Sequence, residues 1–78
     1  MKIRFAGKIY QLEKTDIDKA LRGVDPEMGR RFFVEIGGRE FPIKQAVAKA
    51  IGRPALEIGT NTAYSALRRL GFEVIDHG

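Results

Sequence analysis

Two short segments with helical periodicity stand close together in the C-terminal half, and this pair constrains the fold more than any other feature. Apolar side chains recur at positions i, i+3, i+4, i+7 and i+8 in residues 43–51, and a similar apolar stripe runs through residues 60–70. The connector, residues 53–59, is longer than the tight turn of the simplest helix-turn-helix proteins. Two such helices followed by a strand are typical of a helix-turn-helix or winged-helix relative.

The rest of the chain predicts short strands and one more helix. Apolar runs on either side of glycine-containing turns indicate β-hairpins, because glycine adopts the positive φ that two-residue turns require. We therefore expect one α+β domain over residues 1–78, with β-hairpins and a winged-helix-like C-terminal half. The remaining elements are expected as a hairpin of residues 2–5 and 9–12, a helix with Thr15 as N-cap, a hairpin of residues 31–36 and 39–41 around Gly37 and Gly38, and a last strand of residues 72–75.

Several side chains have an expected place in this scheme. In the connector, Leu56 and Ile58 are expected to be apolar anchors, and Thr60 is a good N-cap for the helix that follows. Gly71 and Phe72 fit a Schellman stop at the end of that helix. Four residues of the first C-terminal helix lie off its apolar stripe and are expected to face solvent: Lys44, Gln45, Ala48 and Lys49.

The positive charge is concentrated in one part of the sequence. The net charge is +4, and residues 39–69 hold six basic and two acidic residues, whereas the remainder holds eight of each. A concentrated basic region is typical of proteins with a polyanionic partner, but a solvated basic face has the same composition. Charge alone favours neither interpretation.

The second C-terminal helix carries the residues that favour nucleic acid. Outside its stripe of Ala63, Leu67 and Leu70 it holds short polar groups, a tyrosine, two arginines and one further alanine. Asn pairs bidentately with adenine and Arg with guanine, whereas lysines and arginines on neighbouring elements hold phosphates. Each residue also has a structural explanation, such as helix capping or complementing the helix dipole; the combination favours DNA. The candidate DNA-binding residues are Arg39, Lys44, Lys49, Arg53, Thr60, Asn61, Thr62, Tyr64, Ser65, Arg68 and Arg69.

An enzyme is not expected. The single histidine, His77, stands next to the end of the chain, there is no cysteine, and no phosphate-binding glycine loop occurs. We therefore expect no catalytic residue, metal, cofactor or small-molecule substrate. The start of the sequence has no apolar run long enough for a signal peptide or membrane span, so we expect a cytoplasmic protein. A basic protein–protein adaptor and a transcriptional regulator without methyl preference are the alternatives, and a homodimer is left open.

Three stretches resemble a known family. They are Lys8–Leu12 leading into the helix at Thr15, the block Phe33–Gln45, and Ala66–Val74. The pattern resembles small actinobacterial proteins that bind 5-methylcytosine DNA, and the DNA-reading domains of McrA-type HNH endonucleases of methyl-dependent restriction. The resemblance covers nearly the whole chain and implies that the partner is double-stranded DNA that carries 5-methylcytosine. No HNH nuclease segment is present, so cleavage is not implied.

The methyl mark comes from the resemblance alone, but its recognition is physically feasible. The C5 methyl group of cytosine lies in the major groove, where thymine presents its own methyl group. Arg68 is expected to contact the neighbouring guanine while its plane covers the methyl group, and Thr62 and Tyr64 offer apolar contacts. Flipping of the base is the other route. Recognition without flipping is favoured, because the chain has no tryptophan to stack on a flipped base.

Overall fold

A computed structural model describes the whole chain, residues 1–78. The fold is α+β, as the sequence predicts, with three α-helices and two antiparallel sheets. One sheet is the two-stranded β1–β2 hairpin, and the other has the strand order β4-β3-β5. The elements in chain order are β1 (Lys2–Phe5), β2 (Lys8–Gln11), α1 (Lys14–Ala20), β3 (Phe32–Ile36), β4 (Arg39–Pro42), α2 (Ile43–Ile51), the 3₁₀ turn η1 (Ala55–Glu57), α3 (Thr60–Arg69) and β5 (Val74–Asp76).

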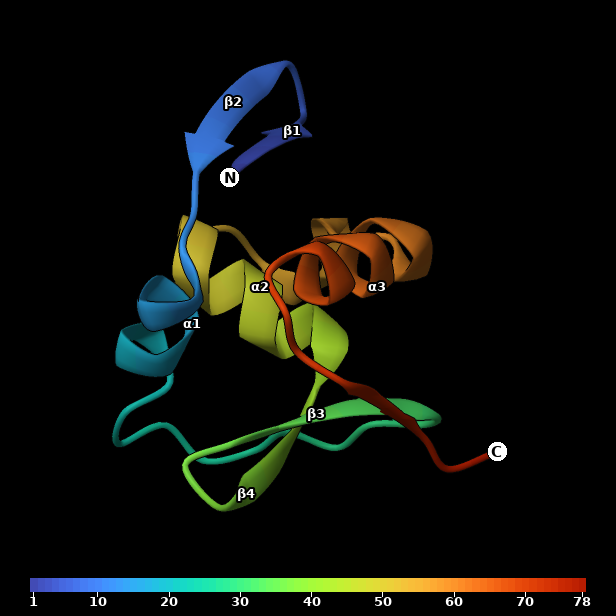
Figure 1. The fold of residues 1–78 in the computed structure, drawn as a ribbon. Helices are drawn as coiled ribbons and strands as arrows, with labels where there is room; N and C mark the ends of the chain where they lie inside the picture. The colour runs from blue at the N-terminus through green and yellow to red at the C-terminus, as the bar shows by residue number, and fades with distance from the viewer.

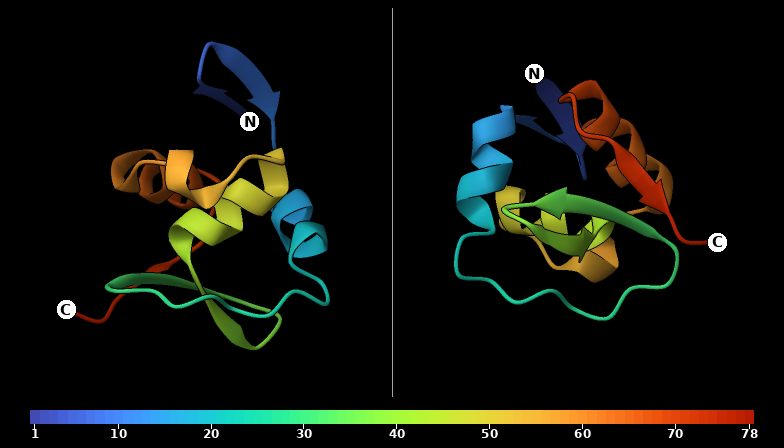
Figure 2. Two further views of the ribbon diagram at one scale, coloured as in Figure 1. Left: turned by 180° about the vertical axis from the view of Figure 1, so that it is seen from behind. Right: turned by 60° about the horizontal axis from the view of Figure 1, so that its bottom comes forward.

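These elements form three layers. The helices lie in the middle, with the β1–β2 hairpin on one side and the three-stranded sheet on the other (Figures 1 and 2). Both hairpins precede the α2–α3 pair, and a single strand, β5, follows α3 and pairs with β3. The winged-helix outline is therefore not confirmed, although the helix pair and the strand after it are present.

Both hairpins turn where the sequence predicts. Ala6 and Gly7 have φ angles of 50° and 78°, and Gly37 and Gly38 have 62° and 82°. Two successive residues with positive φ form a turn that matches the twist of the strands it joins. The β1–β2 register then pairs Ile3 with Tyr10, which puts both side chains on one face.

The helix ends differ from expectation at their N-termini. The N-cap of α1 is Glu13, whose backbone N–H donates to Asp16 Oδ2 at 2.7 Å, so Thr15 lies inside the helix. The N-cap of α3 is Gly59, and Thr60 is the first helical residue. The first residue of each helix depends on how the preceding segment packs, and the local sequence pattern does not determine this. The predicted Schellman stop is confirmed, because the Phe72 N–H donates to the Leu67 carbonyl at 2.9 Å.

The buried residues form one contiguous cluster that centres on α2. Val47 and Leu67 are 1% and 0% exposed and belong to this cluster, as expected for two helices that pack together. Ala48 was expected to face solvent but is buried, because the connector and η1 fold back beside this part of α2. In the connector, Ile58 is buried as predicted, whereas Leu56 is completely exposed and does not anchor anything.

None of the helices combines the length and the apolar character needed to cross a membrane.

The packing of α3 against α2 predicts that truncating Leu67 destabilises the fold much more than truncating Leu56. Leu67→Ala removes a fully buried side chain and should lower the free energy of unfolding by about 2–5 kcal/mol. Leu56→Ala makes the same chemical change at a fully exposed position and should change it by less than about 0.5 kcal/mol. Thermal or urea unfolding of both variants measures the difference. Equal, small effects would contradict the packing of α3 against α2.

Candidate nucleic-acid interface

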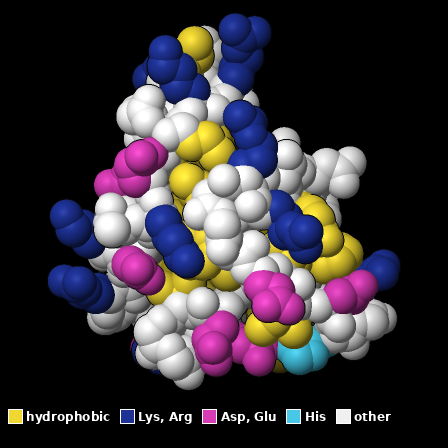
Figure 3. All heavy atoms as spheres, viewed as in Figure 1, with side chains coloured by type: hydrophobic (Ala, Val, Ile, Leu, Met, Phe, Trp, Pro, Cys, Tyr) yellow, Lys and Arg dark blue, Asp and Glu magenta, His cyan; other side chains and the backbone are white.

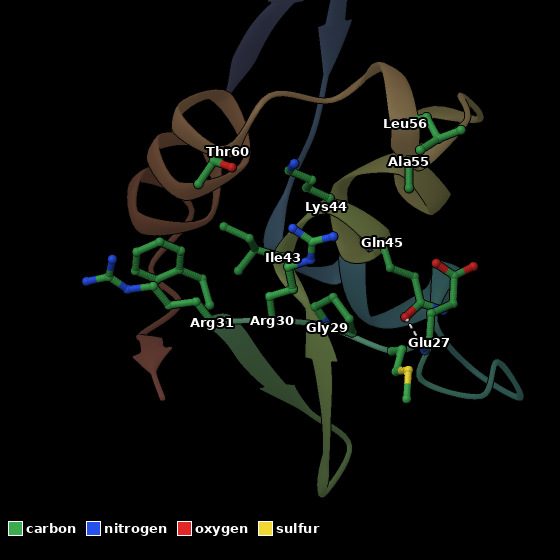
Figure 4. A pocket seen from close by; sticks show the side chains of 13 residues that line it. Glu27, Gly29, Arg30, Arg31, Ile43, Lys44, Gln45, Ala55, Leu56 and Thr60 are labelled. Carbon is green, nitrogen blue, oxygen red and sulfur yellow. Dashed lines mark hydrogen bonds between the residues drawn. The ribbon is translucent and has the colours of Figure 1, made fainter. Parts of the chain in front are cut away.

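A groove of about 660 Å³ opens beside the N-terminal ends of α2 and α3 (Figure 4). Its walls come from the segment 27–32, the start of α2, η1 and the first residue of α3. Ile43 and Phe32 supply buried or half-buried apolar surface, whereas Met28 and Leu56 are fully exposed at its rim. The groove therefore combines an apolar lining with open access from solvent.

Three cations line this groove, and we call them the groove cluster: Arg30, Arg31 and Lys44. Glu27 is the one acidic residue of the lining. Arg30 and Lys44 are exposed and form no ion pair, and Figure 4 shows Lys44 in the space between Thr60 and η1. The sequence predicts Lys44 but misses the two arginines, because they stand in a part of the chain whose charges balance. The Arg-Arg pair directly before a strand is the signal that could have revealed them.

Gln45 fixes the loop that carries those arginines. Its amide Nε2 donates to the Asp25 carbonyl and its Oε1 accepts from the Glu27 N–H, both at 2.9 Å. The side chain is 3% exposed, although the helical pattern predicts that it faces solvent. The prediction is wrong because residues 22–31 fold back over this side of α2, and a buried amide is stable only when its hydrogen bonds are made.

Gly29 lets the same loop come close to the sheet. A Cβ atom at this position would lie 2.8 Å from the Phe33 ring and 2.9 Å from the Pro42 side chain, which is closer than real contacts allow. A side chain here would push the loop outward. The glycine therefore helps to hold the neighbouring Arg30 and Arg31 at the edge of the groove.

Aromatic packing sets the orientation of α3. The Tyr64 ring meets the Phe32 ring edge to face, with centroids 5.5 Å apart and planes at 82°. The Arg31 guanidinium lies 4.8 Å from the centre of the same Phe32 ring. Tyr64 thus points toward β3 and toward the groove cluster, and its ring is held in place rather than free.

The other predicted residues of α3 fall on different flanks. Successive residues turn by about 100° around a helix, so Thr60 and Arg68, each four residues from Tyr64, share its flank. Thr62 is two residues from Tyr64 and lies on the opposite flank with Arg69. The exposed side between the flanks holds Asn61 and Ser65. The structure therefore brings Tyr64 and Arg68 together and does not bring Thr62 to them.

Two predicted arginines are engaged in ion pairs elsewhere. Arg39 lies beside the β3–β4 turn, away from the groove, and its Nη2 is 3.0 Å from Asp25 Oδ1. Arg53 pairs with Glu57, and its guanidinium lies 6.0 Å from the centre of the Phe5 ring. Lys49, in contrast, is exposed without an ion pair and lines a smaller groove next to Arg53. The basic stretch of the sequence is thus only partly a free basic surface.

Acidic residues gather elsewhere. Glu35 and Glu40 are directly opposed across the β3–β4 hairpin on its exposed face, and Asp76 ends β5. Figure 3 shows Asp and Glu side chains along the lower edge of the molecule, over the sheet, and Lys and Arg side chains at its upper end. No group of three or more potential ligand side chains is arranged to hold a metal ion.

Comparison with known proteins gives one result. A family model described as SCO5918-like matches residues 1–77. The chain belongs to the SCO5918-like family. That description names no ligand, partner or reaction. No curated protein and no solved structure matches the chain.

One ion pair of this SCO5918-like chain has a measurable electrostatic consequence. Arg31 Nε and Nη2 lie 2.9 and 3.0 Å from the two carboxylate oxygens of Asp76. This hydrogen bonding, with a further one from the Gly78 N–H, lowers the pKa of Asp76 from 3.8 to about 2. A lowered carboxyl pKa stabilises the folded chain fully above pH 3.8, and the contribution is lost as the pH falls toward 2.

We expect Arg31→Ala to raise the pKa of Asp76 toward 3.8, while the Gly78 N–H keeps part of the shift. An NMR titration of the Asp76 carboxyl carbon measures this. Arg30→Ala removes a neighbouring cation that has no ion pair and should leave the pKa of Asp76 near 2. An unchanged pKa of Asp76 in Arg31→Ala would contradict the pairing.

Proposed function

We propose that this chain is a non-catalytic module that binds double-stranded DNA through α3 and the groove cluster. The observation that carries the proposal is the arrangement of charge around α3. The helix itself contains no acidic residue. Three cations border its N-terminal part: Arg30 and Arg31 from the loop before β3, and Lys44 from α2. Arg30 and Lys44 form no ion pair, whereas Arg31 pairs with Asp76. A duplex offers the matching surface, because each phosphate presents a negative charge at regular spacing.

The dimensions of α3 suit a major groove. Its ten residues make a helix about 15 Å long, and a helix with its side chains is about 10–12 Å across, close to the width of the groove. Asn61, Ser65 and Arg68 are exposed and have the chemistry to contact base edges. Lys44 and Arg30 are suited to phosphates, which position a protein without reading sequence.

Preference for 5-methylcytosine is part of the proposal and rests on the resemblance to methyl-binding proteins. Arg68 and Tyr64 share one flank of α3, so one base step can contact both side chains. Thr62 lies on the other flank and is not expected to contact the same base pair. Recognition therefore depends on Arg68 covering the methyl group and pairing with the adjacent guanine, with Tyr64 beside it.

The first test compares one duplex with and without cytosine methylation. We expect saturable binding at moderate salt and tighter binding to the methylated duplex. Contacts to several phosphates should make log affinity fall with log salt at a slope of about −3 to −5, near −0.9 for each phosphate. A slope near zero would exclude the basic surface as the binding surface.

Two substitutions separate base contacts from phosphate contacts. Arg68→Ala should cost about 1–3 kcal/mol and remove most of the preference for the methylated duplex. Lys44→Ala should weaken both duplexes equally and make the salt slope shallower by about one. Lys19→Ala, an exposed lysine of α1, is the matched control and should change neither quantity. An unchanged methyl preference in Arg68→Ala would assign that arginine to the phosphates.

A basic protein–protein adaptor is the second candidate, and one observation favours it. Met28 and Leu56 are fully exposed at the rim of the groove. Exposed apolar side chains that gather in one place, as these two do at one groove, are typical of protein interfaces. An adaptor predicts no saturable binding to the duplex at moderate salt. The same titration therefore decides between the two functions.

A further inference from the structure

We propose that the β1–β2 hairpin is a second DNA-contacting element, which holds the phosphate strand on the side of α3 opposite the groove cluster. The inference rests on the proposed function and extends it to a part of the chain that the basic stretch 39–69 does not include. Three observations carry it: the charge of the hairpin, its shape, and its position relative to α3.

The hairpin carries basic side chains and no acidic ones. Residues 1–12 contain Lys2, Arg4 and Lys8 and no acidic residue. All three side chains are exposed, and none forms an ion pair. The upper end of the molecule in Figure 3 accordingly shows Lys and Arg side chains with no Asp or Glu among them. We call these three residues the hairpin cluster.

The shape of the hairpin leaves these cations free to contact a partner. Its strands pair only with each other, and the hydrogen bonds that tie it to the chain beyond β2 involve Met1 and the Gln11 side chain, both at its base. Ile3 is buried and anchors the inner face. Strand residues alternate between faces, so Lys2 and Arg4 lie on the outer face, where Arg4 is opposite the exposed Ile9. Lys8 is opposite Phe5 on the inner face, where it is exposed next to the turn. The two-residue turn makes this a short, preformed arm.

The position of the hairpin completes the argument. The helices lie between the hairpin and the three-stranded sheet (Figures 1 and 2). Tyr64 marks the flank of α3 that faces the sheet, because its ring packs on Phe32 of β3. The opposite flank, with Arg69, therefore lies on the hairpin side. Arg53 from the connector lies over Phe5 of β1 and links the hairpin to the segment before α3.

Cations consequently lie on both sides of the helix layer that contains α3. The groove cluster lies on the sheet side, and the hairpin cluster lies on the other. A helix that enters the major groove of DNA has one phosphate strand on each side of it, about 12 Å apart. Two basic clusters on either side of a helix without acidic residues match these two phosphate strands. A single basic patch would contact only one of them.

The experiment measures duplex affinity against salt for a hairpin variant and a control of equal charge. Lys2→Ala/Arg4→Ala removes two cations from the outer face of the hairpin. Lys19→Ala/Arg22→Ala removes two exposed, unpaired cations at the end of α1. We expect the hairpin variant to bind at least about tenfold more weakly and its salt slope to become shallower by about 1.8, or two phosphates. The control should lose less than about twofold, because its cations lie outside the contact surface.

Hydroxyl-radical footprinting on the same duplex adds the strand assignment. The wild-type chain should protect the backbone on both sides of one major groove, and the hairpin variant should lose protection on one side only. The charge-conserving variant Lys2→Arg/Arg4→Lys should bind as the wild type does, and thermal melts check that all variants fold. Equal slopes for the hairpin variant and the wild type, or equal losses in the hairpin variant and the control, would overturn the hairpin contact and leave the proposed function standing. Absence of saturable binding by the wild-type chain would overturn both.

Discussion

Burial of α2 on nearly all sides is the constraint on which the rest of the structure depends. The helix packs against α1, α3, η1 and the three-stranded sheet, so it has almost no solvent-exposed face of its own. Ala46 and Val47 are at most 1% exposed, and only Lys44 and Lys49 project to solvent from its interior turns. A helix that is apolar over most of its circumference requires cover from several elements. In a chain this short, these elements are most of the molecule, and the β1–β2 hairpin is the remaining sheet.

The same constraint explains which parts of the fold the sequence predicts. Turns such as Gly37-Gly38 and the helix stop at Gly71 were predicted and confirmed, because positive φ and its hydrogen bonds are decided within a few residues. Gln45 and Leu56 were predicted wrongly, in opposite directions. Their burial depends on which distant segment folds over them: the loop before β3 covers Gln45, and nothing covers Leu56. Helical periodicity contains no information on either contact.

The candidate site shows a related limit. Charge counted along the sequence points to residues 39–69, but in space Arg39 and Arg53 are paired with acidic residues, whereas Arg30 and the hairpin cluster remain free. Exposed ion pairs contribute little to stability, yet they reduce the charge available to a partner. Counting charges along the sequence therefore predicts that the chain has a basic surface, but not where on the molecule this surface lies. Location depends on the antiparallel β3–β5 pairing and on the loop that Gln45 fixes, and both are long-range features.

The place of α3 follows from the same packing. Its buried stripe consists of two alanines and one leucine, Ala63, Ala66 and Leu67, and small side chains at a helix contact allow the axes to come close. A narrow stripe leaves most of the circumference of α3 exposed, and Phe32 then fixes its rotation through Tyr64. The β1–β2 hairpin and the three-stranded sheet lie on opposite sides of the helix layer that contains α3 (Figure 1). Covering α2 also places part of the basic surface, because the loop that packs over Gln45 of α2 carries Arg30 and Arg31 to the groove beside the N-terminal end of α3.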